Sequence, residues 1–292
     1  MRFILDYRKY VIALREVAGV GPKTFQQLLI TFGSPENIYK VDKEEIAQIP
    51  RIGSEKAEKI FYSGDKLEEI EKHILYLEEQ GIGISTILDE NYPQSLKEID
   101  DPPPLLYFKG EFPIPKKRFV ALVGTTKPEE KGKKEAILWG KALAERDVVV
   151  VSGLAKGIDY HSHQGALIGD GKTYAVLGSG LNNIYPKENQ ILASEICSSG
   201  ALLSEYPLNA SVSVGQLMAR NRIIVGLSQA VVIVETEKKS SGVLNAAQRA
   251  YAQGKPLFIM QEELFDQDDR WKAWGAMLLC GSGDIDLVLS YL

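Results

Sequence analysis

The residues best suited to binding chemistry are glycines and small hydroxyl residues that follow short apolar runs. The clearest case is the segment 148–159, in which four consecutive valines lead to Ser152, Gly153 and then Gly157. Such a turn presents backbone N–H groups at the end of a strand and at the positive end of a helix dipole, so it favours anions. An ordinary strand-to-helix connection has the same appearance, and one turn alone does not distinguish the two.

The same residue types recur after three other apolar runs, at 119–123, 173–177 and 230–234. The carboxyl ends of parallel strands gather at one edge of an open sheet, where ligands bind. The pattern therefore predicts one phosphate site built from several turns. The expected contact residues in these turns are Gly124, Thr125, Lys127, Ser152, Gly153, Lys156, Gly157, Gly178, Ser241 and Gly242.

A polar group opens a helical segment that is otherwise apolar. Arg220, Asn221 and Arg222 precede the run 223–227. Arginine binds phosphate through a bidentate fork, so we expect at least one of the two arginines to contact a phosphate. The lysines of 131–134, by contrast, fit a solvated helix face.

Gly153 is the most specific of these predictions. Only glycine leaves a backbone surface without a Cβ that a phosphate can approach closely. The sequence thus predicts that Gly153→Val blocks ligand entry and leaves the sheet largely intact.

Composition limits the class of protein. The 292 residues carry a net charge of −5, so a nucleic-acid site would have to be a local basic patch. Cys197 and Cys280 lack metal-ligand spacing and fit a reducing compartment. No signal peptide and no apolar run of membrane length is evident. We expect a soluble cytoplasmic protein with no metal and no cofactor.

Alternating strand and helix patterns from residue 119 onward predict a doubly wound parallel α/β sheet. Strands are expected at 119–123, 147–151, 173–177, 201–203, 230–234 and 256–260. Helices are expected at 129–146, 159–169, 187–199, 214–228 and 242–253. After Asp284 there is room for one short element only.

The amino-terminal part has a different organisation. The glycine-containing segments 17–24 and 49–56 each precede a short helix and resemble a helix-hairpin-helix pair. Such hairpins can hold a phosphate, but they often serve only as packing units. A helix at 67–80 and a strand at 83–88 follow, and a proline run then forms a rigid connector. We place a helical domain at 1–110 and the sheet domain at 111–292.

With these motifs in order, the chain resembles the DNA-processing protein A family, also called Smf. The matching motifs include Gly19-Val20-Gly21, Tyr92-Pro93, Asp101–Tyr107, Val123-Gly124-Thr125, Ser152–Ala155, Gly157–Asp159, Ala175–Gly178, Ser204-Glu205, Arg220–Ile224 and Ser241-Gly242. The sequence departs from the family pattern at Thr126, where the family has arginine, and at Leu217-Met218, where it has Phe-Pro.

The resemblance implies a Rossmann-like domain behind a helical one. It also implies a homodimer that binds and protects single-stranded DNA and helps to load a RecA-type recombinase during natural transformation. Asp159, His163 and Glu205 fall in the matching motifs and would shape the pocket.

An enzyme is the main alternative. Related nucleoside-monophosphate phosphoribohydrolases carry a glutamate just after a glycine-rich turn, and the segment 240–247 has no carboxylate. Asp159 and His163 lie four residues apart and could form a dyad, although a helix cap and a structural histidine are more common in such places. A nucleotide-binding sensor or a nucleotide hydrolase with the same pocket remains the second hypothesis.

Overall fold

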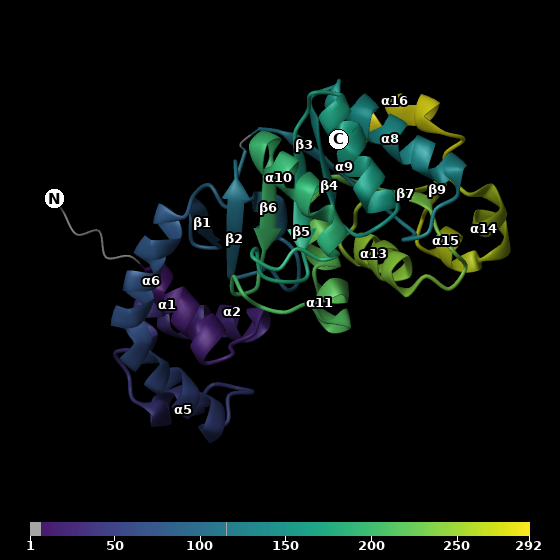
Figure 1. Cartoon of the computed structure of the whole chain (residues 1–292). Helices are drawn as coiled ribbons and strands as arrows, with labels where there is room; N and C mark the ends of the chain where they lie inside the picture. The colour runs from purple at the N-terminus through teal and green to yellow at the C-terminus, as the bar shows by residue number, and fades with distance from the viewer. Residues whose placement is uncertain (1–6, 115) are drawn as a thin grey trace. The chain divides into compact units, whose positions relative to one another are not determined.

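The computed structural model describes residues 7–114 and 116–292 (Figure 1). Their contacts divide the chain into two compact units. The first holds the described residues up to Tyr92 together with Asp100–Leu106, and the second holds Pro93–Ile99 and Tyr107–Leu292. The short segment Pro93–Ile99 therefore packs with the sheet unit although it precedes the proline run in sequence.

The first unit is mainly helical. Its elements are α1 (Arg8–Ile12), the π-helical turn η1 (Ala13–Val17), α2 (Pro22–Phe32), α3 (Pro35–Ile38), α4 (Lys43–Ala47), α5 (Ser54–Ser63), η2 (Gly64–Lys66), α6 (Leu67–Glu79) and β1 (Ile82–Thr86). Gly21 and Gly53 precede α2 and α5 in extended backbone, as a helix-hairpin-helix pair requires. Lys56 Nζ donates to Thr24 Oγ1 at 3.3 Å, which places the starts of the two helices side by side.

A mixed, mostly parallel sheet forms the centre of the second unit. Its strand order is β2-β6-β5-β4-β3-β7-β8-β9. The strands are β2 (Leu105–Gly110), β3 (Arg118–Gly124), β4 (Val148–Ser152), β5 (Thr173–Leu177), β6 (Ala201–Ser204), β7 (Ala230–Glu235), β8 (Leu257–Ile259) and β9 (Met277–Leu278). Only β2 runs antiparallel to its neighbour, β6, in the pairings of this unit. The topology confirms the predicted Rossmann-like architecture.

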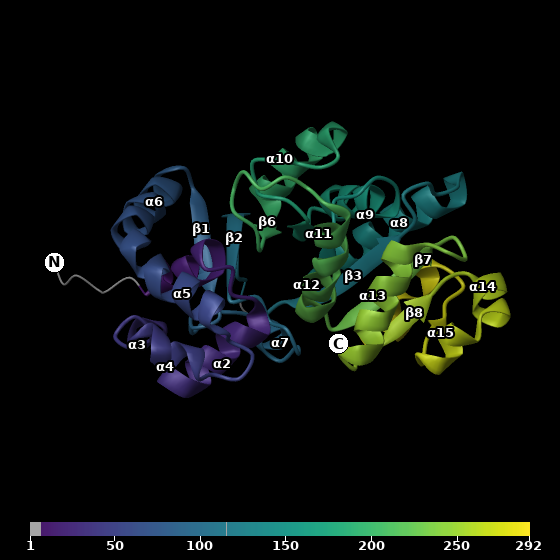
Figure 2. The same cartoon turned by 90° about the horizontal axis from the view of Figure 1, so that it is seen from below.

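Helices cover both faces of this sheet (Figures 1 and 2). The helices and helical turns of this unit are α7 (Gln94–Lys97), α8 (Glu130–Ala144), α9 (Ile158–Ile168), η3 (Lys187–Asn189), α10 (Gln190–Ser199), α11 (Val214–Ala219), α12 (Asn221–Leu227), α13 (Ser241–Ala252), α14 (Glu262–Gln267), α15 (Asp269–Ala273), η4 (Ser282–Asp284) and α16 (Ile285–Leu289). Helices α8, α9 and α10 lie on one face, and α12 and α13 lie on the other. No helix of the described residues is long and apolar enough to cross a membrane.

The strand and helix predictions hold closely from residue 118 onward. The valines of β4 are buried on both faces of the sheet, as their uninterrupted apolar run indicates. The predicted helix 214–228 is two helices, because α11 ends and α12 begins at Arg220. The patterns did not reveal β2, β9, α14 and α15, which are short elements near the ends of the sheet.

Glycines allow α8 and α9 to pack closely. A Cβ on Gly140 would overlap the carbonyl oxygen of Ser162, and one on Gly165 would overlap that of Ile137. Backbone atoms of one helix therefore occupy the space that a side chain would need on the other.

We expect Gly140→Ala to lower the free energy of unfolding by roughly 1–3 kcal/mol, because the added methyl group must push the two helices apart. Denaturant unfolding measures this change. Gly215→Ala is the matched control: its nearest atom is Ser213 Oγ at 3.9 Å, so it should destabilise little or stabilise by up to about 1 kcal/mol. Equal losses in the two variants would contradict the packing argument.

Candidate functional site

A cavity of about 710 Å³ opens at the carboxyl ends of β3, β4 and β7. Its walls come from 123–127, from Ala155 and Lys156, and from the segments around α11 and the start of α13. Of the predicted residues, the lining includes Gly124, Thr125, Lys127, Lys156, Asp159, Arg220, Asn221, Ser241 and Gly242. Those outside the lining are Ser152, Gly153, Gly157, His163, Gly178, Glu205 and Arg222.

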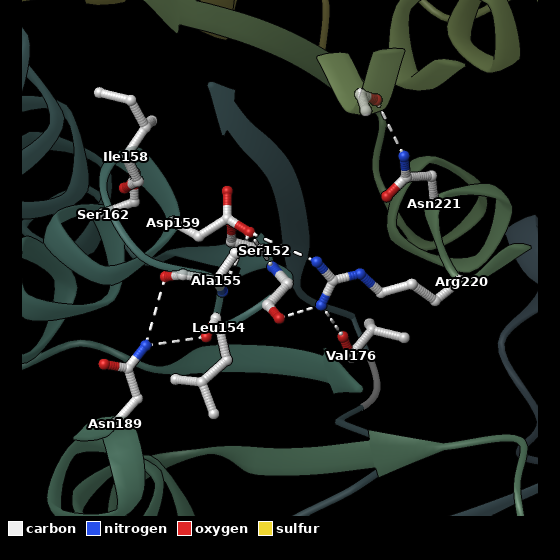
Figure 3. Close-up of polar contacts among 12 residues, drawn as sticks. Ser152, Leu154, Ala155, Ile158, Asp159, Ser162, Val176, Asn189, Arg220 and Asn221 are labelled. Carbon is white, nitrogen blue, oxygen red and sulfur yellow. Dashed lines mark hydrogen bonds and ion pairs between the residues drawn. The ribbon is translucent and has the colours of Figure 1, made fainter. Parts of the chain in front are cut away.

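The turn after β4 binds a carboxylate of its own chain. Asp159 Oδ2 accepts hydrogen bonds from the N–H groups of Gly153 at 3.2 Å and Ala155 at 3.3 Å (Figure 3). Asp159 is buried, and this burial raises the pKa of its carboxyl group while Arg220 opposes the shift. Two of the N–H groups that the sequence suggested for a phosphate thus have an internal anion as their partner.

Arg220 explains the glycine at position 153. Its guanidinium donates to the carbonyl oxygen of Val176 at 2.9 Å and to that of Gly153, and it lies 3.8 Å from Asp159 Oδ2 (Figure 3). A Cβ on Gly153 would overlap this guanidinium. The space without a Cβ is therefore filled by a side chain that is 7% exposed, which corrects the expectation that it stays open for a phosphate.

The other two residues of the polar group also have internal partners. Arg222 Nη2 donates to both carboxylate oxygens of Glu205, at 2.8 and 2.7 Å, and both side chains are buried. Asn221 Nδ2 donates to the carbonyl oxygen of Gly242 at 3.0 Å (Figure 3). Asn221 thus ties the start of α12 to the first turn of α13. Arg222 and Glu205 form a buried ion pair outside the pocket lining.

Asn189 is a positioning residue that the predicted set omits. Its Nδ2 donates to the carbonyl oxygens of Leu154 at 2.9 Å and Ala155 at 3.3 Å (Figure 3). Leu154 has φ +57, so this turn needs outside support for a backbone conformation that side chains disfavour. The one signal in the sequence is that the pair Glu188-Asn189 also resembles the family pattern.

His163 is fully buried and does not line the pocket. Its Nδ1 lies 2.7 Å from Thr173 Oγ1, and the Thr173 hydroxyl donates to the carbonyl oxygen of Val150 at 2.8 Å. Nδ1 must therefore carry the proton and donate to Thr173. Burial, and then the nearby Arg220, lower the pKa of His163 to about 3. His163 and Asp159 bind separate protein groups, which gives each a structural role.

Exposed lysines and a helix start give the pocket its capacity for anions. Lys127, Lys156 and Lys239 line it, and Lys156 pairs with Glu188 at 3.0 Å. Lys127 and Lys239 have no ion-pair partner among residues 7–114 and 116–292. Helix α13 begins in the same wall without a side-chain cap, and the space beside Gly242 is open. Lys239 was absent from the predicted set.

These features define a class of protein: a Rossmann-like domain with an anion-favouring pocket, in one chain with a helix-hairpin-helix tandem. The sequence model of the family "DNA recombination-mediator protein A" matches residues 83–277, and that of the "SAM-like Helix-hairpin-helix tandem" matches residues 11–61. The chain therefore belongs to the DNA recombination-mediator protein A family, which confirms the resemblance seen in the sequence.

Individual proteins of this family are also similar to the chain in sequence. Protein Smf of Synechocystis is 35% identical over 244 residues, and DNA processing protein DprA of Bacillus subtilis is 39% identical over 189 residues. These matches cover 81% and 64% of this chain and 60% and 63% of the relatives. The chain thus spans about three fifths of the length of these curated relatives.

Two solved structures are also similar. DNA processing protein A of Streptococcus pneumoniae superposes with a TM-score of 0.79 at 32% identity, covering 95% of this chain and 96% of that one. DNA processing protein A of Helicobacter pylori, whose structure concerns its single-stranded DNA binding mode, gives a TM-score of 0.63 at 30% identity. It covers 72% of this chain and 97% of that one.

The role of Gly153 can be tested by a double-mutant cycle. We expect Gly153→Ala to cost roughly 2–3 kcal/mol in the wild-type background, because its methyl group displaces Arg220. In an Arg220→Ala background the methyl group meets no guanidinium, so the same change should cost at least about 1 kcal/mol less. Denaturant unfolding of the four proteins gives both values. An equal cost in both backgrounds would contradict the role that we assign to Arg220.

The buried histidine predicts a pH dependence of stability. The pKa of His163 is about 3 when folded, against an ordinary value of 6.5. Between these values the unfolded chain binds one more proton, so stability should fall with decreasing pH by about 1.4 kcal/mol per unit. His163→Asn lacks this titration, and the difference between its pH profile and that of the wild type isolates the histidine. Parallel profiles from pH 6.5 down to 4 would show that the folded histidine takes up its proton normally.

Proposed function

We propose that the chain is a single-stranded DNA-binding protein that acts in DNA processing during natural transformation. The observation that carries this proposal is the pocket in which Lys127, Lys239 and the uncapped start of α13 converge. Lysine side chains and helix N-termini both contact phosphates without reading sequence. The protein as a whole is acidic, so this local group supplies the positive charge that a polyanion needs.

Single-stranded rather than duplex DNA suits the pocket wall. Tyr185, Leu217 and Met218 line the same cavity as the lysines. Their aromatic and apolar surfaces can contact unpaired bases while the lysines contact the backbone. The printed subject of the H. pylori structure, single-stranded DNA binding by a similar protein, supports the same assignment.

The residues that we propose as phosphate contacts differ in part from those predicted from the sequence. We assign them to Lys127, Lys156, Lys239, Ser241 and Gly242. Thr125 lines the pocket, but its N–H donates to the carbonyl oxygen of Glu235 and its hydroxyl to Glu237. Arg220, Arg222 and Asp159 then act as positioning residues, since their charged groups bind other parts of the chain. Asn221 holds the first turn of α13, where the phosphate contacts at Ser241 and Gly242 lie.

The assembly and partners form the rest of the proposal. The protein would act as a cytoplasmic homodimer that protects single-stranded DNA and helps to load a RecA-type recombinase. The family description as a recombination mediator supports this role. A nucleotide sensor or hydrolase is the alternative, and the buried positions of Asp159 and His163 do not favour it.

The lysines provide the test. Lys127→Gln combined with Lys239→Gln should weaken binding of a single-stranded oligonucleotide about ten-fold or more at low salt, because two phosphate contacts are lost. The slope of log K against log salt should become shallower by about 1.4, at about 0.7 per phosphate. Fluorescence anisotropy with a labelled oligonucleotide over a range of salt concentrations measures both quantities.

Lys141→Gln combined with Lys172→Gln is the control, because it removes the same charge outside the pocket. It should leave the slope nearly unchanged. Equal effects in the two double variants would indicate a general electrostatic effect and reject the pocket as the site. Tight binding of a mononucleotide with little dependence on salt would favour the sensor or hydrolase instead.

A further inference from the structure

The first turn of α8 is the place where a Rossmann-like domain would hold a nucleotide phosphate. It follows β3 directly, and its backbone donors and helix dipole favour an anion. In this chain a carboxylate of the protein already lies there. Glu235, the last residue of β7, extends its side chain to the start of α8.

Two contacts fix the position of this carboxylate. Glu235 Oε1 accepts a hydrogen bond from the N–H of Glu129, the residue that precedes α8, at 3.0 Å. Glu235 Oε2 lies against Gly132 in the first turn, where an added Cβ would overlap it. The carbonyl oxygen of Glu235 also accepts the N–H of Thr125 at 2.7 Å, so the residue is held at both its backbone and its side chain.

The turn after β4 uses the same arrangement. There Asp159 accepts the N–H groups of Gly153 and Ala155. Internal carboxylates therefore occupy two strand-end positions whose backbone donors would suit a phosphate. The start of α13 differs, because it has no side-chain cap and Gly242 faces open space.

We propose that Glu235 is a specificity-determining residue whose carboxylate is a tethered substitute for a phosphate at the first turn of α8. It closes this position to inorganic phosphate and to the phosphate groups of nucleotides by occupying their space and repelling their charge. Ligand phosphates are thereby restricted to the lysines and the start of α13. This last consequence, for DNA, rests on the proposed function.

Removing the side chain should restore the anion site. Glu235→Ala leaves the Glu129 N–H without the carboxylate that accepts from it, and it empties the space beside Gly132. We expect inorganic phosphate to raise the melting temperature of this variant saturably, relative to chloride at equal ionic strength. Its apparent affinity for phosphate should be at least about ten-fold higher than that of the wild type, a difference of about 1.4 kcal/mol.

Two controls separate occupancy from charge. Glu235→Gln keeps the space filled and an oxygen available to the Glu129 N–H, so it should show little response to phosphate. Glu195→Ala removes one negative charge from an exposed position of α10 outside the pocket, and it should respond like the wild type. Glu235→Ser opens the same space and replaces the alanine variant if that one does not fold.

The outcomes are distinct. Phosphate responses in the alanine or serine variant that equal that of the wild type would overturn the proposal, as would an equal gain in Glu195→Ala. Oligonucleotide binding by the wild type is measured in parallel. Its failure would reject the proposed function but would leave the phosphate comparison, and hence the role of Glu235, decided on its own evidence.

Discussion

The buried pair of Arg220 and Asp159 is the interaction on which the pocket depends. Arg220 joins the end of β4 to the end of β5 through the carbonyl oxygens of Gly153 and Val176, and Asp159 binds two N–H groups of the turn after β4. Each charge compensates the burial of the other, whereas a buried charge left alone is strongly destabilising, by about 3–5 kcal/mol. The contacts of both side chains with the turn after β4 therefore stabilise its observed conformation.

The contacts of Asp159 and Arg220 show that a glycine-rich turn need not be a phosphate site. Backbone donors at strand ends and helix starts need hydrogen-bond partners, and a carboxylate of the protein can satisfy them as well as a bound phosphate can. Asp159 and Glu235 both do so here. A Cβ at position 153 or 132 would overlap a side chain of the protein, Arg220 or Glu235, so a bound ligand is not needed to explain either glycine. A glycine-rich turn thus indicates that another group lies close to its backbone, but it does not show whether that group is a ligand or a side chain of the protein.

The sequence predicts where the strands and their turns lie, but it does not predict which side chains fill the space around those turns. The apolar runs of β3, β4, β5 and β7 predict the sheet well, because strands buried on both faces have little choice of composition. The edge of the site where Thr125, Lys156 and Ser241 meet also follows from topology. The inward direction of Arg220 and Arg222 does not, because their partners, Val176 and Glu205, are distant in sequence. Asn189 ends the short turn η3 and Lys239 lies in the loop before α13, and no periodicity indicates side-chain directions in such segments.

The arginine near the pocket is buried and the lysines that line it are exposed, and this difference determines the kind of ligand contact that the pocket can make. The planar guanidinium of Arg220 is committed to fixed carbonyl acceptors, which suits a rigid scaffold. Lys127 and Lys239 are exposed point charges on flexible stems, so they can follow a backbone phosphate without a defined geometry. Contacts of this type draw their free energy largely from released counterions and carry no base sequence information. A pocket built in this way fits a ligand that is a chain of phosphates better than one that presents a single phosphate in a fixed position.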